Sequence, residues 1–259
     1  MTQNKTALIT GASSGIGYEF AKLLAKDNYN LILVARSEEK LNYLKNYSEA
    51  EYKISVKVIV KDLSKIASVD EIYNELVRKK IYIDILINNA GFGNFGKFSE
   101  TNWQTEAEMI QLNILALTHL TKLFLKGMIE RKRGKILNVA STGSFQPCPL
   151  MAVYGATKAY VLSFSEAIAN ELKGTGITVT ALCPGPTETN FFKVGKFEES
   201  KIVKNKKLPS AEDVAKYGYN AMNKSKTVAI HGLMNKTLAF LVGFAPRNLV
   251  TNVSRKKIN

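Results

Sequence analysis

Thr10-Gly11-Ala12-Ser13-Ser14-Gly15-Ile16-Gly17 follows a short apolar run at residues 6–10 and opens a segment with helical spacing. The glycines let the backbone turn tightly and approach a ligand closely. The N-terminus of the following helix offers unpaired N–H groups to a negative charge, so this stretch predicts a pyrophosphate site. The spacing is Gly-x-x-x-Gly-x-Gly rather than the commoner Gly-x-Gly-x-x-Gly. The expected contacts come from Gly11, Ser13, Ser14, Gly15 and Ile16.

Short apolar runs alternate with helix-like segments along the whole chain. The runs cover residues 6–10, 30–35, 56–60, 83–87, 135–139, 177–182 and 227–230. Their continuous Val, Ile and Leu content is typical of strands buried on both faces of a parallel sheet. Residues 19–25, 69–77, 105–130 and 152–172 place apolar side chains at helical spacing instead. The alternation predicts an α/β fold, a Rossmann-type doubly wound parallel sheet of about seven strands flanked by helices, with ligands at the carboxyl ends of the strands.

Length and composition fit one globular domain spanning residues 1–259, with 46% hydrophobic and 22% charged residues. Two cysteines and two histidines are too few and too scattered for a metal cluster, so no metal is expected. The first residues carry no apolar secretory segment, and we expect a cytoplasmic, reduced protein.

The net charge of +14 raises the question of a nucleic-acid partner. The lysines are spread along the chain and are locally dense only at residues 201–207 and 255–257, without interleaved aromatic residues. A basic, solvated surface explains this pattern better than nucleic-acid binding, which we do not expect.

Tyr154 and Lys158 are four residues apart in a helix-like segment, so their side chains share one helix face. Free tyrosine titrates near about 10, and acid–base work at neutral pH needs a shift of about 3 units, roughly 4 kcal/mol. An adjacent ammonium acts in that direction. Ser141 precedes this pair and follows the run at 135–139. Tyr18 and Lys22 have the same spacing, but no such serine precedes them. The pair therefore predicts proton transfer to or from a carbonyl oxygen.

Arg36 follows the second predicted strand, where a carboxylate usually holds the ribose hydroxyls of NAD. A carboxylate would repel a 2′-phosphate, whereas a guanidinium pairs with one through charge-assisted hydrogen bonds. The expected cofactor is therefore NADP(H).

A series of motifs occurs in a fixed order: the turn at 10–17, Asp62-Leu63, Asn88-Asn89-Ala90-Gly91, Asn113, Ser141, Tyr154, Lys158 and Pro184-Gly185. In this order the chain resembles the short-chain dehydrogenase/reductase family over nearly its whole length. The resemblance implies adenine contacts from Asp62 and Leu63, and ribose contacts from Asn89, Ala90 and Gly91. It also implies nicotinamide contacts from Pro184, Gly185, Thr187 and Thr189.

Three positions are less clear from this pattern. Asp84 and Asn88 fit either a site or a structural role. Asn28 replaces a usual glycine before the second strand, and asparagine tolerates the left-handed conformation needed there.

The same resemblance implies hydride transfer between a nicotinamide and a carbonyl carbon, with the protein handling the proton. Tyr154 would donate to the nascent alkoxide, or accept in the alcohol direction. Lys158 would lower the pKa of the phenol and bind the nicotinamide ribose. Ser141 would orient and polarise the carbonyl, and Asn113 would hold a water that relays protons through Lys158.

Segments rich in aromatic and aliphatic residues at 92–95, 145–151 and 191–197 are expected to form the substrate pocket. They indicate a bulky, lipophilic carbonyl or alcohol rather than a sugar. The candidate substrate residues are Phe92, Phe95, Ser141, Phe145, Phe191 and Phe192.

Residues 233–259 extend the chain beyond the last predicted strand, and the apolar stretch at 238–245 is too short to span a bilayer. It predicts a wall of a lipophilic pocket, a subunit contact or a monotopic membrane contact. We expect one of the first two roles and not the membrane. Related enzymes pair through their two long helices, here 105–130 and 152–172, which implies a homodimer or homotetramer.

Similar extensions in family members that reduce steroids and other lipids imply a hydroxysteroid substrate, bile acids included. The alternative is a 3-oxoacyl-thioester reductase, whose acidic carrier protein or coenzyme A the basic surface would attract, although the apolar extension is unlike carrier-protein reductases. A non-catalytic NADP(H)-binding sensor or scaffold is a third hypothesis, and the intact Ser141, Tyr154 and Lys158 argue against it.

Overall fold

The computed structural model describes residues 5–195, 200 and 207–258. Residues 196 and 197 of the predicted substrate segment, and residues 201–206 of the basic stretch, lie outside the described residues.

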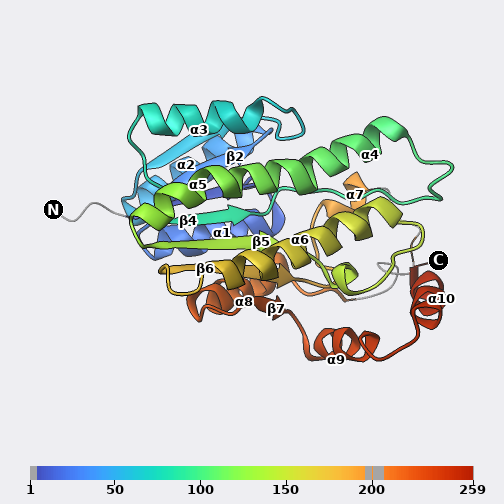
Figure 1. Ribbon diagram of the computed structural model, residues 1–259. Helices are drawn as coiled ribbons and strands as arrows, with labels where there is room; N and C mark the ends of the chain where they lie inside the picture. Colours follow the sequence, from blue (N-terminus) through green and yellow to red (C-terminus); the bar gives the residue numbers. More distant parts are fainter. Residues whose placement is uncertain (1–4, 196–199, 201–206, 259) are drawn as a thin grey trace.

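Seven parallel strands form one sheet in the order β3-β2-β1-β4-β5-β6-β7, which confirms the doubly wound prediction (Figure 1). The strands are β1 (Thr6–Thr10), β2 (Asn30–Ala35), β3 (Val56–Val60), β4 (Ile85–Asn88), β5 (Gly134–Val139), β6 (Ile177–Cys183) and β7 (Val228–Ile230). The strand order reverses direction between β1 and β4. Ligands of such sheets bind in the crevice at this reversal.

Helices cover both faces of the sheet (Figure 1). They are α1 (Gly15–Lys26), α2 (Glu38–Tyr52), α3 (Ser68–Arg78), α4 (Trp103–Ile110), α5 (Leu117–Glu130), α6 (Ala152–Glu171), α7 (Phe191–Val194), α8 (Ala211–Asn223), α9 (Leu233–Val242) and α10 (Arg247–Ile258). A 3₁₀ turn, Thr142–Phe145, follows β5. The predicted helix at 105–130 is one continuous run, Trp103–Glu130, in which a π-helical turn, Gln111–Ala116, joins α4 to α5.

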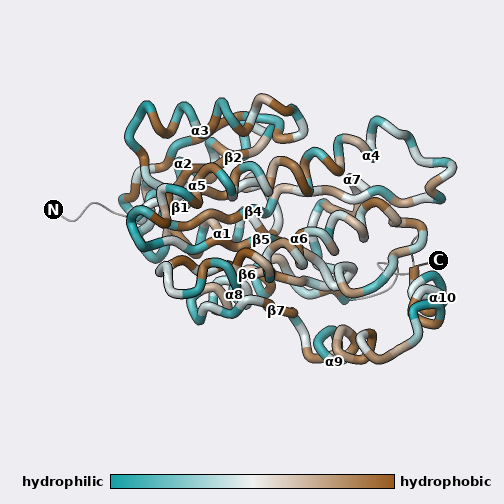
Figure 2. The backbone as a smooth tube through the Cα atoms, in the orientation of Figure 1, coloured by the Kyte–Doolittle hydropathy of each residue, from teal (hydrophilic) through white to brown (hydrophobic). Residues whose placement is uncertain are grey.

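Side chains of each strand alternate between two hydrophobic cores. Ala7 and Ile9 of β1 join the core beneath α1, α2 and α8, whereas Leu8 joins the core beneath α3, α5 and α6. Figure 2 shows hydrophobic residues gathered along β4 and β5, with hydrophilic residues on the outer turns of α3. The prediction for Asn28 is also confirmed, because this residue has a φ of 60°.

Asn88 belongs to a buried polar network rather than to the ligand cavity. Its Nδ2 donates to Thr121 Oγ1 at 3.0 Å and to Asn138 Oδ1 at 2.9 Å. Asn138 Nδ2 in turn donates to Ser165 Oγ at 2.9 Å. The network therefore links β4 and β5 to α5 and α6 through the core.

Asp84 lies at the opposite end of the sheet from the ligand cavity. Its carboxylate accepts from the Thr6 backbone N–H at 2.9 Å and from Arg133 Nη2 at 2.6 Å. It ties the starts of β1 and β5 together, which is a structural role.

Replacing Asn138 with alanine should destabilise the fold by about 1–3 kcal/mol, because the buried Asn88 and Ser165 lose a hydrogen-bond partner. Urea unfolding followed by circular dichroism measures the change. Asn46→Ala, at an exposed position of α2, is the matched control and should move the midpoint little. Equal midpoints for the two variants would contradict the structural role of the network.

Candidate active site

A cavity of about 1320 Å³ opens where the strands end at the carboxyl edge of the sheet. It exceeds the roughly 300–1,000 Å³ of a pocket for one small ligand, so it has room for a dinucleotide and a substrate together. Every predicted cofactor residue lines this cavity: Gly11, Ser13, Ser14, Gly15, Ile16, Arg36, Asp62, Leu63, Asn89, Ala90, Gly91, Tyr154, Lys158, Pro184, Gly185, Thr187 and Thr189.

The glycine turn has no space for side chains where it faces the loops after β4 and β6. Gly11 and Gly15 have φ angles of 66° and 57°, which favour glycine. A Cβ at Gly11 would lie 2.8 Å from Asn89 Nδ2, and one at Gly15 would lie 3.0 Å from Thr189 Cγ2. Ser14 precedes α1, and its side chain makes no capping hydrogen bond. The first N–H groups of α1 therefore stay available to an anion at the cavity wall.

Arg36 is exposed at the cavity end formed by β2 and β3, with Ala35 beside it and no carboxylate at either position. Asp62 lies nearby and accepts from the N–H and the hydroxyl of Ser64 at 3.0 and 2.8 Å. Burial opposes ionisation of Asp62, but these hydrogen bonds and the charge of Arg36 lower its pKa below the usual value. At neutral pH this end thus offers a guanidinium for a phosphate and a carboxylate acceptor.

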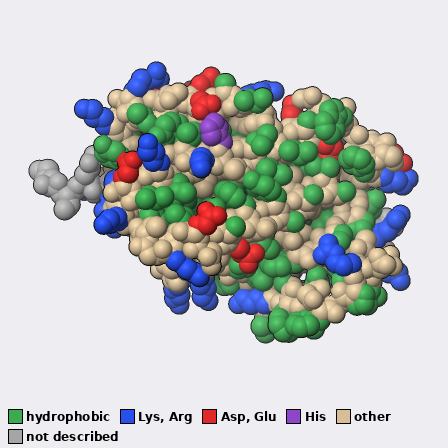
Figure 3. Space-filling model, viewed as in Figure 1, with side chains coloured by type: hydrophobic (Ala, Val, Ile, Leu, Met, Phe, Trp, Pro, Cys, Tyr) green, Lys and Arg blue, Asp and Glu red, His purple; other side chains and the backbone are tan. Residues whose placement is uncertain are grey.

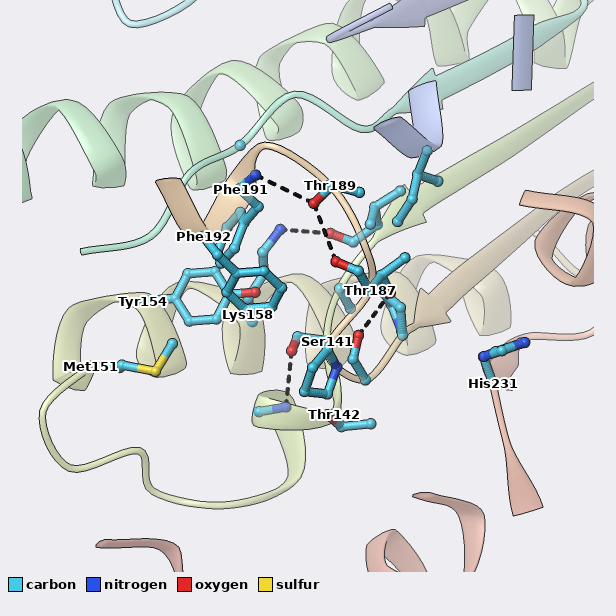
Figure 4. Close-up of a pocket in the computed structure, with 18 of the residues that line it drawn as sticks. Ser141, Thr142, Met151, Tyr154, Lys158, Thr187, Thr189, Phe191, Phe192 and His231 are labelled. Atoms are coloured by element: carbon cyan, nitrogen blue, oxygen red, sulfur yellow. Dashed lines mark hydrogen bonds between the residues drawn. The ribbon is translucent and has the colours of Figure 1, made fainter. Parts of the chain in front are cut away.

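Tyr154 and Lys158 lie one helical turn apart on α6, with Ser141 facing them from the end of β5 (Figure 4). Tyr154 and Lys158 are 8% and 6% exposed. The Lys158 Nζ donates to the Val139 carbonyl at 2.7 Å and lies 5.9 Å from the centroid of the Tyr154 ring. Ser141 caps the 3₁₀ turn by accepting from the Gly143 N–H at 3.0 Å. The three predicted side chains therefore meet at one point of the cavity.

Burial controls the titration of this pair. It raises the pKa of Tyr154 to about 12, against a smaller lowering from the Ser141 hydrogen bond. It lowers the pKa of Lys158 to about 8. We expected the ammonium to lower the phenol pKa, but in the protein alone desolvation raises it. The phenol consequently keeps its proton at neutral pH, as a proton donor must.

Asn113 lies behind the cavity wall, in the π-helical turn between α4 and α5, and is 1% exposed. Its Nδ2 donates to the Phe92 carbonyl at 3.0 Å and to Thr157 Oγ1 at 3.1 Å, while its Oδ1 accepts from the Phe92 N–H at 3.2 Å. Both amide hydrogens are taken, so this side chain positions Phe92 and α6. A Cβ at Gly91 would lie 2.9 Å from the Asn113 Oδ1, so a larger residue at position 91 would displace this side chain.

The loop after β6 closes the cavity through a chain of short-range hydrogen bonds (Figure 4). The Thr187 hydroxyl donates to the Gly185 carbonyl at 2.9 Å, and the Thr189 hydroxyl donates to the Thr187 carbonyl at 3.4 Å. Thr189 Oγ1 also accepts from the Phe191 N–H at 3.3 Å. The loop thus presents its threonines and the start of α7 to the Tyr154 side of the site.

The substrate side is lined by aromatic residues, as the sequence indicated. Phe92, Phe145, Phe191 and Phe192 line the cavity, and the Phe191 ring packs on Tyr154 with centroids 5.3 Å apart. Phe95 is a correction: it packs against the hydrophobic cluster beside the cavity and is not among the lining residues. Phe95 is three residues beyond Phe92, the last lining residue of this segment, and an aromatic side chain in the sequence does not show which side of the loop it faces.

Some lining residues were missed in the sequence. His231 follows β7 at the cavity, and the rule that ligands bind where parallel strands end would have found it. Burial lowers its pKa below the usual value. The extension at residues 233–259 was predicted as a pocket wall or a subunit contact, without naming single lining residues. The residues of α9 and α10 that line the cavity are Leu233, Met234, Asn235, Leu238, Ala239, Leu241, Val242, Leu249, Val250, Val253, Ser254 and Ile258.

These observations fit a nicotinamide dinucleotide. The uncapped start of α1 and the glycines without side-chain space suit the pyrophosphate, and Tyr154 and Lys158 lie at the other end of the same cavity. Among the described residues, no group of three or more His, Cys, Asp or Glu side chains is placed to hold a metal ion.

Comparison with known proteins agrees with this geometry. The family model for short chain dehydrogenases matches residues 5–199. The chain is 38% identical over 250 residues to a very-long-chain 3-oxoacyl-CoA reductase of Phaeosphaeria nodorum, covering 92% of this chain and 72% of that one. It is 32% identical over 239 residues to hydroxysteroid dehydrogenase-like protein 1 of Gallus gallus, covering 92% and 70% of the two chains.

Solved structures agree as well. A short-chain dehydrogenase from Sphingobium yanoikuyae in complex with NADPH superposes with a TM-score of 0.85 at 30% identity, over 95% of this chain and 94% of that one. A 7beta-hydroxysteroid dehydrogenase gives 0.86 at 25% identity, over 96% of both chains. The chain is therefore an oxidoreductase that belongs to the short-chain dehydrogenase/reductase family.

Proposed function

We propose that this protein reduces long-chain 3-oxoacyl-coenzyme A thioesters with NADPH. The observation that carries the proposal is the 38% identity, across 92% of the chain, to a very-long-chain 3-oxoacyl-CoA reductase. The sequence favoured a hydroxysteroid and kept the thioester as the alternative, and the relatives reverse that order. A hydroxysteroid remains the second candidate, supported by the likeness to the 7beta-hydroxysteroid dehydrogenase.

The shape and lining of the cavity support an acyl chain. From Tyr154 the lining continues to aliphatic side chains of α9 and α10, including Leu238, Val242, Leu249 and Val253. These residues make this wall of the cavity apolar, which suits a lipophilic substrate such as a hydrocarbon chain. The surplus of positive charge on the protein attracts the phosphates of coenzyme A.

The proton chemistry follows from the buried side chains. When bound along the glycine turn and Lys158, NADPH would supply the hydride for the 3-oxo carbon. Tyr154 donates its phenolic proton to the oxygen of that carbonyl, and its raised pKa keeps the proton in place until the oxygen becomes basic. Ser141, whose hydroxyl hydrogen-bonds the phenol in the protein alone, would hold the same oxygen, and the Lys158 ammonium lies 5.9 Å from the centroid of the phenol ring. In the protein alone, Lys158 is mainly charged at neutral pH because its pKa is about 8.

The preference for NADPH over NADH is part of the proposal. Arg36 supports it because a guanidinium at the cavity edge pairs with a 2′-phosphate. Position 35 is alanine, so the carboxylate that would bind the ribose hydroxyls of NAD is missing there. The structural relative bound to NADPH gives further support.

Tyr154→Phe should lower kcat about 10²- to 10⁴-fold, the contribution of a positioned proton donor. The Kd for NADPH, measured by fluorescence titration, should change little because the ring and its packing on Phe191 remain. Phe98→Leu, at an exposed site away from the cavity, is a control for the loss of an aromatic group. Substantial turnover by Tyr154→Phe would refute the donor role.

The double variant Ala35→Asp, Arg36→Ala should raise the KM for NADPH about 10- to 100-fold, because a charge-assisted hydrogen bond is lost and a repulsive carboxylate is added. The KM for NADH should fall or stay constant. Lys40→Ala, an exposed cation on α2, serves as the control for a general loss of charge. Unchanged cofactor preference in the double variant would contradict the role of Arg36.

A substrate panel read by NADPH absorbance tests the reaction itself. We expect kcat/KM to rise with the acyl length of 3-oxoacyl-CoA thioesters, because a longer chain buries more apolar surface along α9 and α10. Val242→Trp should reduce this gain for long chains and leave short chains unaffected. Higher kcat/KM for ketosteroids than for every thioester would favour the second candidate, and no turnover of any ketone would favour a non-catalytic protein.

A further inference from the structure

The positive charge of the protein is concentrated at its C-terminal end. Residues 214–259 contain eight of the 36 Lys and Arg residues and none of the 22 Asp and Glu residues, which is +8 of the net +14. The last acidic side chain before the end of the chain is that of Asp213. This segment includes α9 and α10, so a strongly cationic region carries the apolar extension.

The outer face of α9 is apolar and exposed. Phe240 of α9 and Phe244 in the turn after it are 67% and 76% exposed. Leu233, Met234 and Leu241 of α9 are 80%, 73% and 53% exposed and also line the cavity, which Phe240 and Phe244 do not. The rings of Phe240 and Phe244 lie 5.0 Å apart. Scattered apolar residues are normal on protein surfaces, but a cluster of this kind marks an interaction site. We call these five residues the outer face.

The remaining apolar residues of α9, Leu238, Ala239 and Val242, also line the cavity. None of the ten residues of α9 is buried among the described residues. A helix that is apolar on both sides is normally covered on both sides. The cavity accounts for the residues that line it, whereas Phe240 and Phe244 stay largely exposed in the part of the chain that the structure describes.

The positive charge around the outer face indicates what kind of partner it binds. Figure 3 shows hydrophobic side chains along the lower edge of the molecule, where α9 lies, with Lys and Arg side chains beside them. The cations of α9 and α10 include Lys236, Arg247, Arg255 and Lys256. Two copies of so cationic a surface repel each other, whereas a bilayer with anionic lipids attracts it and accepts the aromatic side chains.

We infer that α9 and α10 dock on the surface of an anionic phospholipid bilayer, with the outer face inserted among the lipids. The contact is monotopic, because α9 has ten residues and cannot cross a bilayer. The helical run Trp103–Glu130 has the length and the mean hydropathy, 1.2, to cross a membrane, but α5 packs on the sheet and contributes to the core. The sequence alone did not favour this contact, since it does not show which residues of α9 are exposed.

Docking on the membrane places the acyl cavity at its surface. Because Leu233, Met234 and Leu241 belong both to the outer face and to the lining of the cavity, the cavity opens beside the docked surface, and a long-chain substrate would enter it from the lipid. This consequence for substrate entry rests on the proposed function, whereas the docking rests on exposure and charge alone.

Vesicle flotation tests the docking. The protein should bind vesicles of phosphatidylcholine with phosphatidylglycerol at least about tenfold better than vesicles of phosphatidylcholine alone, and added salt should weaken the binding. Phe240→Ser with Phe244→Ser should lower the binding about tenfold or more. Neither phenylalanine lines the cavity, so NADPH binding should be unchanged. Because the assay contains no substrate, it is independent of the proposed reaction.

Phe98→Ser with Ile66→Ser removes two exposed apolar side chains elsewhere, at 64% and 78% exposure, and should leave vesicle binding unchanged. Phe240→Trp in a Trp103→Phe background keeps the outer face intact, and its emission should shift to the blue with anionic vesicles. Equal vesicle binding by the wild type and the double serine variant, or no blue shift, would overturn the inference. Loss of a lipid-free dimer in the double serine variant, seen by light scattering, would assign the outer face to a second copy and overturn it too.

Discussion

The site depends on the junction between β1 and β4, where the strand order of the sheet reverses. The Thr10 hydroxyl donates to the Ile87 carbonyl at 3.3 Å and accepts from the N–H groups of Asn89 and Ala90, both at 3.0 Å. Asn89 Nδ2 returns a hydrogen bond to the Thr10 carbonyl at 3.0 Å. One threonine thus fixes the glycine turn against the loop after β4, and the cavity between them follows from that connection.

The lowered pKa of Lys158 and the raised pKa of Tyr154 have one physical origin, which is the dry interior formed around α6. Burial favours the neutral form of each group, so it works against the charged ammonium and for the protonated phenol. The Val139 carbonyl offsets part of the cost of burying the Lys158 ammonium by accepting its hydrogen bond. Reduction of a carbonyl needs a neutral acid beside the substrate, and the fold provides this state before any ligand binds.

Patterns with a strong local cause were predictable from the sequence. Continuous apolar runs predicted the strands, and the glycine turn and the spacing of Tyr154 and Lys158 located the cavity. The π-helical turn at Asn113 was not predictable, because its bonds to Phe92 and Thr157 come from distant parts of the chain. The apolar character of α9 indicated a lipophilic substrate, but the composition of a helix does not distinguish a ring system from an acyl chain.

The contact between α9 and the loop after β6 restricts natural variation. Asn235 Nδ2 donates to the His231 carbonyl at 2.8 Å, and a Cβ at Gly185 would lie 2.6 Å from the same nitrogen. A larger residue at position 185 would collide with the Asn235 side chain and displace it from its hydrogen bond to the His231 carbonyl. Homologues that keep α9 and its asparagine should therefore keep glycine at position 185. Homologues without α9 are free to carry other residues at that position.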